Sequence, residues 1–203
     1  MLGYALAGIA VAVVVVLVIL AMLPAGNSEA SAVRPAGPGQ VHTSASPRSS
    51  MLAKGDVVPS FSAPGFHMEA TDGSGYVIKG ERIGWSSYQG VPVVLVIWAP
   101  WCPHCQAELP RLAEVAKDYP NVRLLTVVSA IGQEPGPTPN AYLAQHGLTF
   151  PVALDDAEGT LLRILGIQGF PTLYFVNSDG TVAQASTGEI DESSLRLMMG
   201  NLS

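Results

Sequence analysis

Apolar runs and helix-like periodicities alternate along the chain from residue 91 onward. Two continuous apolar stretches, "VPVVLVIW" (residues 91–98) and "VRLLTVVS" (residues 122–129), are typical of strands that are covered on both faces. Between them, apolar residues recur at the spacing of one helix face: Leu109, Leu112, Ala113 and Ala116. The pattern predicts a strand, a helix and a second strand in succession, which is typical of an α/β domain.

Three further helices are expected after the second strand. The first covers residues 138–147, with an N-cap candidate in Thr138 and a stop at Gly147. A shorter helix over residues 157–166 ends at a glycine, and a closing helix starts at or near Asp191.

A hairpin is expected between the last two helices. Residues 172–176 and 181–187 have strand composition and flank the turn sequence "NSDG". The order of elements predicts an α/β fold in which a central, mostly parallel sheet carries one antiparallel edge hairpin and is flanked by helices.

The N-terminus has a different pattern. Residues 2–23 carry no charged side chain, and a helix of this length spans about 33 Å, enough for a bilayer core of about 30 Å. We therefore expect a transmembrane anchor over residues 1–23. A cleaved signal peptide, with "Ala-Ser-Ala" at residues 30–32 as its cleavage site, and a buried soluble helix are the alternatives.

The next segment, residues 24–50, is rich in Pro, Gly, Ser and Ala and has almost no large apolar residue. Such a composition cannot bury enough surface to offset its ordering entropy, so a flexible linker is expected there. Residues 51–203 then form the globular domain. Charged residues make up only 13% of the chain, the net charge is −6, and basic residues are not clustered, so nucleic acid is not an expected partner.

Both cysteines of the chain lie in "WCPHC", directly after the first predicted strand. Cys102 falls at the start of a predicted helix, where unpaired N–H groups and the helix dipole favour a thiolate. Pro103 suits the first helical turn, and His104, when protonated, adds positive charge beside the sulfur. Cys105 lies one turn further in and is expected to be shielded, whereas Cys102 is expected to be exposed. The spacing suits reversible thiol–disulfide exchange.

Other uses of the cysteine pair remain open. A structural disulfide here would close a loop too small to stabilise the fold much. A zinc site needs four ligands, and His104 is the one histidine close in sequence. Covalent haem attachment needs a histidine directly after the second cysteine, where Gln106 stands. We therefore predict a redox site with no metal and no other cofactor.

These stretches together resemble the thioredoxin-like superfamily, and within it the membrane-anchored TlpA/ResA/CcmG group of extracytoplasmic thiol–disulfide oxidoreductases. The similarity covers residues 55–197 and includes "GDVVPSFSAPGF", "GVPVVLVIWAPWCPHCQAELP" and "GFPTLYFVNSDG". The W-C-x-x-C-x-x-E-x-P part is specific, whereas the opening motif is weak by itself. The resemblance implies a thioredoxin-like fold for the domain.

The resemblance also implies roles for single residues. Cys102 matches the nucleophile, Cys105 the resolving thiol, and Glu108 the acidic residue that tunes the thiols. Pro171 matches the cis-proline whose loop faces the disulfide and pairs with substrate backbone; from its motif alone, an ordinary proline at the start of a strand fits equally well.

Three further positions complete the candidate site. Phe170 and Trp101 are expected to border the substrate, and Pro103 with His104 to tune the redox potential. A solvated glutamate on the helix surface is the alternative interpretation of Glu108.

Two departures from the pattern bear on the direction of electron flow. Val96 stands where thioredoxin has a buried aspartate, which leaves Glu108 as the substitute for proton handling. The dipeptide Pro103-His104 is that of the oxidase DsbA, in which histidine stabilises the reduced thiolate and makes the disulfide more oxidising.

The first hypothesis is an anchored reductase that exchanges disulfides with protein substrates, including apocytochrome c cysteines, and is re-reduced by a membrane partner of the DsbD/CcdA type. A DsbA-like oxidase is the alternative. A thiol peroxidase would need threonine where Ala99 stands, and a non-catalytic binding module would not need the cysteines. The catalytic domain is expected on the extracytoplasmic side because thiol chemistry suits export, although Arg34 beyond the apolar run argues weakly for the opposite orientation.

Overall fold

The computed structural model describes residues 40–70, 76–130 and 132–203. Within these residues, seven strands form one sheet in the order β2-β1-β5-β4-β3-β6-β7. The strands are β1 (Ser62–Ala70), β2 (Tyr76–Gly84), β3 (Val93–Trp98), β4 (Arg123–Val128), β5 (Val152–Leu154), β6 (Thr172–Val176) and β7 (Val182–Thr187). Strand β3 lies between β4 and β6, so the residues that directly follow its carboxyl end lie away from the two outer strands of the sheet.

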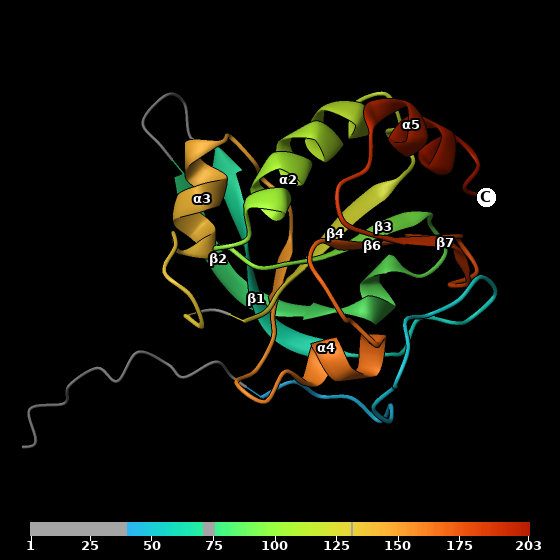
Figure 1. The fold of residues 1–203 in the computed structure, drawn as a ribbon, viewed down its shortest axis with the longest axis horizontal. Coiled ribbons are helices and arrows are strands. Elements are labelled where there is room, and N and C mark those ends of the chain that lie inside the picture. The colour runs from blue at the N-terminus through green and yellow to red at the C-terminus, as the bar shows by residue number, and fades with distance from the viewer. Residues whose placement is uncertain (1–39, 71–75, 131) are drawn as a thin grey trace, which may run out of the picture. The chain divides into compact units, whose positions relative to one another are not determined.

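Helices cover both faces of this sheet (Figure 1). They are α2 (Pro103–Ala116), α3 (Pro139–Gln145), α4 (Thr160–Leu165), α5 (Glu192–Gly200) and the 3-10 helix η1 (Trp85–Tyr88). Side chains of α2, α3 and α5 pack together in one hydrophobic cluster, and those of α4 and η1 in a second. The two clusters lie on opposite faces of the sheet, and each receives alternate side chains from the same strands.

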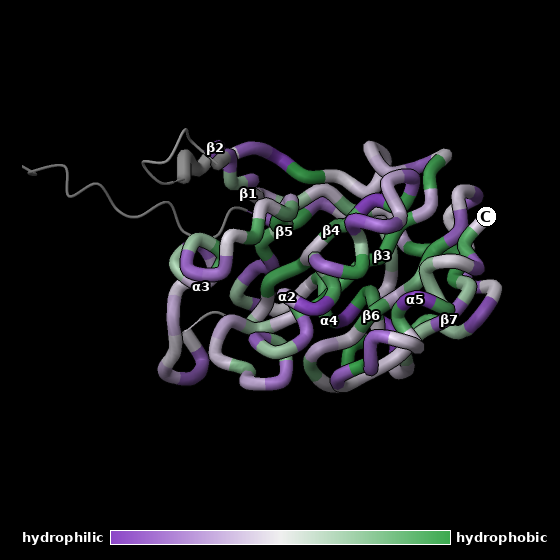
Figure 2. Tube along the Cα trace, turned by 90° about the horizontal axis from the view of Figure 1, so that it is seen from above, coloured by the Kyte–Doolittle hydropathy of each residue, from purple (hydrophilic) through white to green (hydrophobic). Residues whose placement is uncertain are grey.

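Strand β3 shows why the central strands are apolar throughout. Its alternate side chains enter different clusters: Val94, Val96 and Trp98 join α2, while Val93, Leu95 and Ile97 lie on the side of α4. All six are completely buried. The hydrophobic residues accordingly gather along the central strands, and polar residues lie on the outer surfaces of the helices and on the hairpin β1–β2 (Figure 2).

Several predicted elements are confirmed with their ends. Thr138 caps α3 by accepting a hydrogen bond from the backbone N–H of Ala141 at 3.4 Å. Asp191 caps α5 in the same way through Ser194 at 2.9 Å. Helix α4 ends at Gly166, which adopts the left-handed conformation, and β6 and β7 form the expected hairpin.

The prediction of a mostly parallel sheet is wrong, and the expected edge hairpin β6–β7 is one of two. Only β3–β4 and β4–β5 are parallel pairs among the described strands, and β1–β2, β1–β5, β3–β6 and β6–β7 are antiparallel. A second hairpin, β1–β2, occupies the other edge. This hairpin escaped prediction because β1 contains Pro64 and Gly65, which are typical of turns. Strand β5 escaped prediction because it has only three residues.

Gly65 is required where β1 approaches β5. A Cβ atom at this position would lie 2.4 Å from the backbone oxygen of Val152, which cannot move without disturbing the sheet. We expect Gly65→Ala to lower the free energy of unfolding by about 1–3 kcal/mol, as overpacking does elsewhere. Urea denaturation measures this change. Gly80→Ala on the paired strand is the control, since its nearest neighbouring atom is 4.0 Å away; equal stability of the two variants would contradict this account.

The predicted anchor over residues 1–23 and most of the predicted linker lie outside the described residues. In the part of the chain that is described, no helix combines the length and apolar character that a membrane span needs. The end of the predicted linker is corrected, because residues 40–50 run along the domain. His42 pairs with Ser62 through two backbone hydrogen bonds of 2.8 Å, and Arg48 forms an ion pair of 2.6 Å with Asp56. Among the described residues, the domain therefore begins before the boundary predicted at residue 51.

Candidate active site

The two cysteines lie where β3 gives way to α2. Strand β3 ends at Trp98, and the chain turns over three residues before Cys102, which is the N-cap of α2. The N–H of Cys105 donates a hydrogen bond to the Cys102 sulfur at 3.4 Å. Pro103 occupies the first helical position, where its missing N–H costs no hydrogen bond. The free helix N–H groups and the dipole thus act on the Cys102 sulfur, as the sequence predicts.

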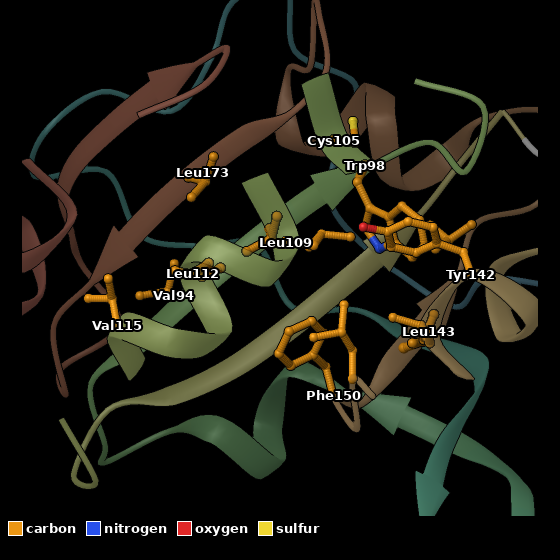
Figure 3. Close-up of a cluster of buried hydrophobic side chains, with 14 of the residues drawn as sticks. Val94, Trp98, Cys105, Leu109, Leu112, Val115, Tyr142, Leu143, Phe150 and Leu173 are labelled. Carbon is orange, nitrogen blue, oxygen red and sulfur yellow. The ribbon is translucent and has the colours of Figure 1, made fainter. Parts of the chain in front are cut away.

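The two thiols, both free, differ in burial. Cys105 is completely buried, as expected, and burial followed by its hydrogen bond with Cys102 raises the pKa of its thiol well above the usual range. The Cys105 side chain belongs to the same cluster as Leu109, Leu112 and Val115, which follow it along α2 (Figure 3).

The expectation of an exposed Cys102 is wrong in degree, because only 5% of this residue is accessible. The Phe170–Pro171 loop accounts for part of the cover, since the Cys102 sulfur lies 3.8 Å from the Phe170 carbonyl oxygen. Cys102 is nevertheless the more accessible residue of the pair.

The cis-proline predicted from the resemblance is present. The Phe170–Pro171 peptide bond is cis, and β6 begins at the next residue, Thr172. Phe170 meets the Trp101 ring edge-on with centroids 6.0 Å apart, and the Trp101 indole N–H donates to the Ala130 carbonyl at 2.8 Å. The proline loop therefore lies beside the Cys102 sulfur, and the Trp101–Phe170 pair lies at the same loop.

Glu108 lies on the buried face of α2, one turn beyond Cys105. The residue is completely buried, which excludes the alternative of a solvated surface glutamate. Its Oε2 atom accepts hydrogen bonds from Arg111 at 2.9 Å and from the Ile190 N–H at 3.1 Å, while Oε1 has no hydrogen-bond partner among the described residues. Burial raises the pKa of Glu108, and these two donors oppose the shift. A carboxyl group in this state can hold or accept a proton at Oε1.

Glu108 differs in this respect from Asp155, the other buried carboxyl group among the described side chains. Both Asp155 oxygens accept hydrogen bonds, from Ser129 and from the N–H groups of Leu161 and Leu162 in the first turn of α4. Asp155 therefore serves as a structural cap. Val96, at the position of the thioredoxin aspartate, is buried in the cluster that contains Cys105 and offers no proton acceptor.

Two residues that the sequence analysis missed connect His104 to Glu108. The Nδ1 atom of His104 lies 2.7 Å from Glu189 Oε1, and Arg111 donates to Glu189 Oε2 at 3.3 Å as well as to Glu108. The hydrogen bonds from His104 and then Arg111 lower the pKa of Glu189. Arg111, three residues after Glu108, could have been found from helical spacing; Glu189, 85 positions from His104, could not.

A dithiol at the N-terminus of a helix, beside a cis-proline loop and over a mixed central sheet, defines a thioredoxin-like protein. Residues 55–185 match the AhpC/TSA family, and the chain belongs to this family. The thiol–disulfide oxidoreductase ResA of Bacillus subtilis (strain 168) is 30% identical over 131 residues, which are 64% of this chain and 68% of that protein. The soluble secreted antigen MPT53 of Mycobacterium tuberculosis (strain H37Rv) is 33% identical over 104 residues, 51% of this chain and 58% of its own length.

Solved structures agree with this grouping. The putative thiol:disulfide interchange protein DsbE from Chlorobium tepidum has a TM-score of 0.54 at 25% identity and covers 73% of this chain and 96% of its own. The M. tuberculosis protein dsbF has the same TM-score, 0.54, at 27% identity, with 61% and 90% covered. The chain is therefore a thiol–disulfide oxidoreductase of the ResA-type group, as its sequence predicts.

Proposed function

We propose that the protein reduces disulfide bonds in other proteins through Cys102 and Cys105, on the extracytoplasmic side of a membrane to which its N-terminus anchors it. One observation carries the proposal. A completely buried thiol, Cys105, and a buried carboxyl group with a free oxygen, Glu108, share one face of the helix that Cys102 caps. A binding module would need neither group.

The reaction proceeds by two exchanges. The Cys102 thiolate attacks one sulfur of the substrate disulfide, the substrate S–S bond breaks, and the departing substrate thiolate takes up a proton. Cys105 then gives up its proton, with Glu108 as acceptor, and attacks the Cys102 sulfur of the mixed disulfide. The second substrate thiol leaves with a proton. The substrate gains two electrons and two protons, and the enzyme retains a Cys102–Cys105 disulfide.

Each component of the site has a part in this sequence. The helix N-terminus favours negative charge on Cys102, and the high pKa of Cys105 keeps the second thiol protonated until it is needed. The backbone beside Pro171 and the rings of Phe170 and Trp101 border the position of the substrate segment. Pro103 and His104 tune the redox potential, His104 through the positive charge that it carries when protonated. Renewed activity needs a dithiol donor, for which a membrane partner of the DsbD/CcdA type is the proposed class.

The oxidase alternative is supported by His104, because a positive charge beside Cys102 favours the reduced enzyme and so a more oxidising disulfide. The pairing of His104 with Glu189 weakens this support. Ala99 argues against the peroxidase hypothesis, because it is completely buried and has no hydroxyl group with which to position a peroxide.

Trapping in cells separates a reductase of cytochrome precursors from an oxidase. In a Cys105→Ser variant the mixed disulfide on Cys102 cannot be resolved, so substrates stay covalently attached. We expect mass spectrometry to find apocytochrome c cysteines among the captured partners. A broad set of exported proteins would instead favour the oxidase. The control is Cys102→Ser/Cys105→Ser, which should capture nothing.

A further inference from the structure

Four side chains form a continuous polar chain from the active-site dipeptide to the buried carboxyl group. His104 contacts Glu189 at 2.7 Å, Glu189 contacts Arg111 at 3.3 Å, and Arg111 contacts Glu108 at 2.9 Å. Arg111 also donates to the Ile190 carbonyl oxygen at 2.8 Å, which fixes the guanidinium between the two glutamates. The segment that leads into α5 thus delivers a carboxylate to the start of α2.

Glu189 has no role in the exchange steps, yet it is the residue that engages the dipeptide. One of its oxygens binds the imidazole and the other binds Arg111. Both contacts involve partly exposed side chains, with 69% of His104 and 36% of Glu189 accessible. Ion pairs that are this exposed to solvent contribute little to the stability of the fold. We therefore expect this arrangement to act on the charge around Cys102 rather than on folding.

We propose that Glu189 is a positioning residue whose carboxylate engages the imidazole of His104, offsets the charge that His104 presents to Cys102 and thereby makes the Cys-Pro-His-Cys site less oxidising. This inference rests on the proposed exchange function and concerns its direction. Without an acidic partner, His104 in its protonated form would be free to stabilise a thiolate at Cys102.

The sign of the effect follows from the equilibrium with glutathione. The reduced enzyme reacts with glutathione disulfide to give the enzyme disulfide and two glutathione molecules, and two electrons leave the enzyme. Any change that stabilises the Cys102 thiolate stabilises the reduced enzyme and lowers the equilibrium constant of this reaction. Loss of the Glu189 charge acts in this direction, both directly and by releasing His104.

The experiment compares the glutathione equilibrium constant of the wild type with those of Glu189→Gln, His104→Gln and the double variant. We expect Glu189→Gln to lower the constant about two- to fivefold, the range that exposed charge pairs support. In the His104→Gln background the same substitution should cause a clearly smaller decrease. Glu192→Gln is the matched control, because Glu192 is also exposed and paired with an arginine, Arg196, but lies outside the chain of contacts.

The outcomes separate this inference from the proposed function. If the wild type equilibrates with glutathione but Glu189→Gln has the same constant, or shows the same decrease with and without His104, the positioning role is overturned and the exchange function stands. If the wild type exchanges no disulfide with glutathione or with insulin, the proposed function itself fails. Circular dichroism of each variant establishes that the constants refer to folded protein.

Discussion

Cys102→Ser is expected to reduce insulin reduction to the rate of the uncatalysed reaction. A serine hydroxyl neither ionises at neutral pH nor forms a disulfide, so the first exchange cannot occur. The turbidity of precipitating insulin chains, with dithiothreitol as donor, measures the rate. Serine is nearly isosteric, and the substitution lies at an N-cap, a position that serine favours, so the helix should remain intact.

Cys105→Ser is the informative comparison for this variant. It retains the attacking thiol and should form a mixed disulfide that accumulates instead of turning over. Activity in Cys102→Ser equal to that of the wild type would assign the reaction to another group and would remove the role proposed for the helix N-terminus.

Glu108→Gln is expected to slow the resolving step by about 100-fold or more, the lower end of the contribution of general acid–base catalysis. The amide keeps the size of the side chain but cannot accept a proton from Cys105. Single-turnover measurements that follow the decay of the mixed disulfide isolate this step. The matched control is Glu114→Gln on the same helix, because Glu114 is exposed and its ion pair in the described part of the chain is with Lys117. Equal decay rates in Glu108→Gln and the wild type would exclude Glu108 as the proton acceptor.

The pH dependence of the same variant provides a second measurement. Glu108 acts as a base only when it is ionised, so the rate should fall as the pH drops through its pKa. Burial raises this pKa, which places the fall in rate above the usual range of carboxyl groups, and Glu108→Gln should lack this fall.

The free energy of unfolding has the opposite dependence on pH. The folded state holds the Glu108 proton more tightly than the unfolded chain, so the wild type should lose stability relative to Glu108→Gln as the pH rises from the usual carboxyl range through the raised pKa.

The sequence was most informative where local rules decide the structure. The apolar run that forms β3, the caps at Thr138 and Asp191, and the motif around Cys102 all depend on neighbours within one turn or strand. Local rules failed for β1. Its close approach to β5 requires a glycine at residue 65, and glycine in the sequence is typical of a turn rather than a strand. The balance of parallel and antiparallel pairs depends on such long-range pairing.

The candidate site shows the same division. The positions of Cys102, Cys105 and Pro171 could be predicted because they lie within recognisable motifs. The burial of Glu108 could not be predicted, since a glutamate on the exposed face of a helix can have the same neighbours in sequence. The contact of Glu189 with His104 depends on how the segment before α5 docks against α2, and nothing near either residue encodes that docking.

The capping role of Cys102 has a thermodynamic consequence. One sulfur both accepts a hydrogen bond from the first turn of α2 and is the proposed nucleophile, so the redox state of the enzyme and the stability of its fold are linked. The difference in unfolding free energy between the reduced and oxidised forms equals the difference in disulfide-bond stability between the native and unfolded chain. Denaturation curves of the two forms would therefore measure how far folding shifts the redox potential of the cysteine pair from that of the unfolded chain, without any redox buffer.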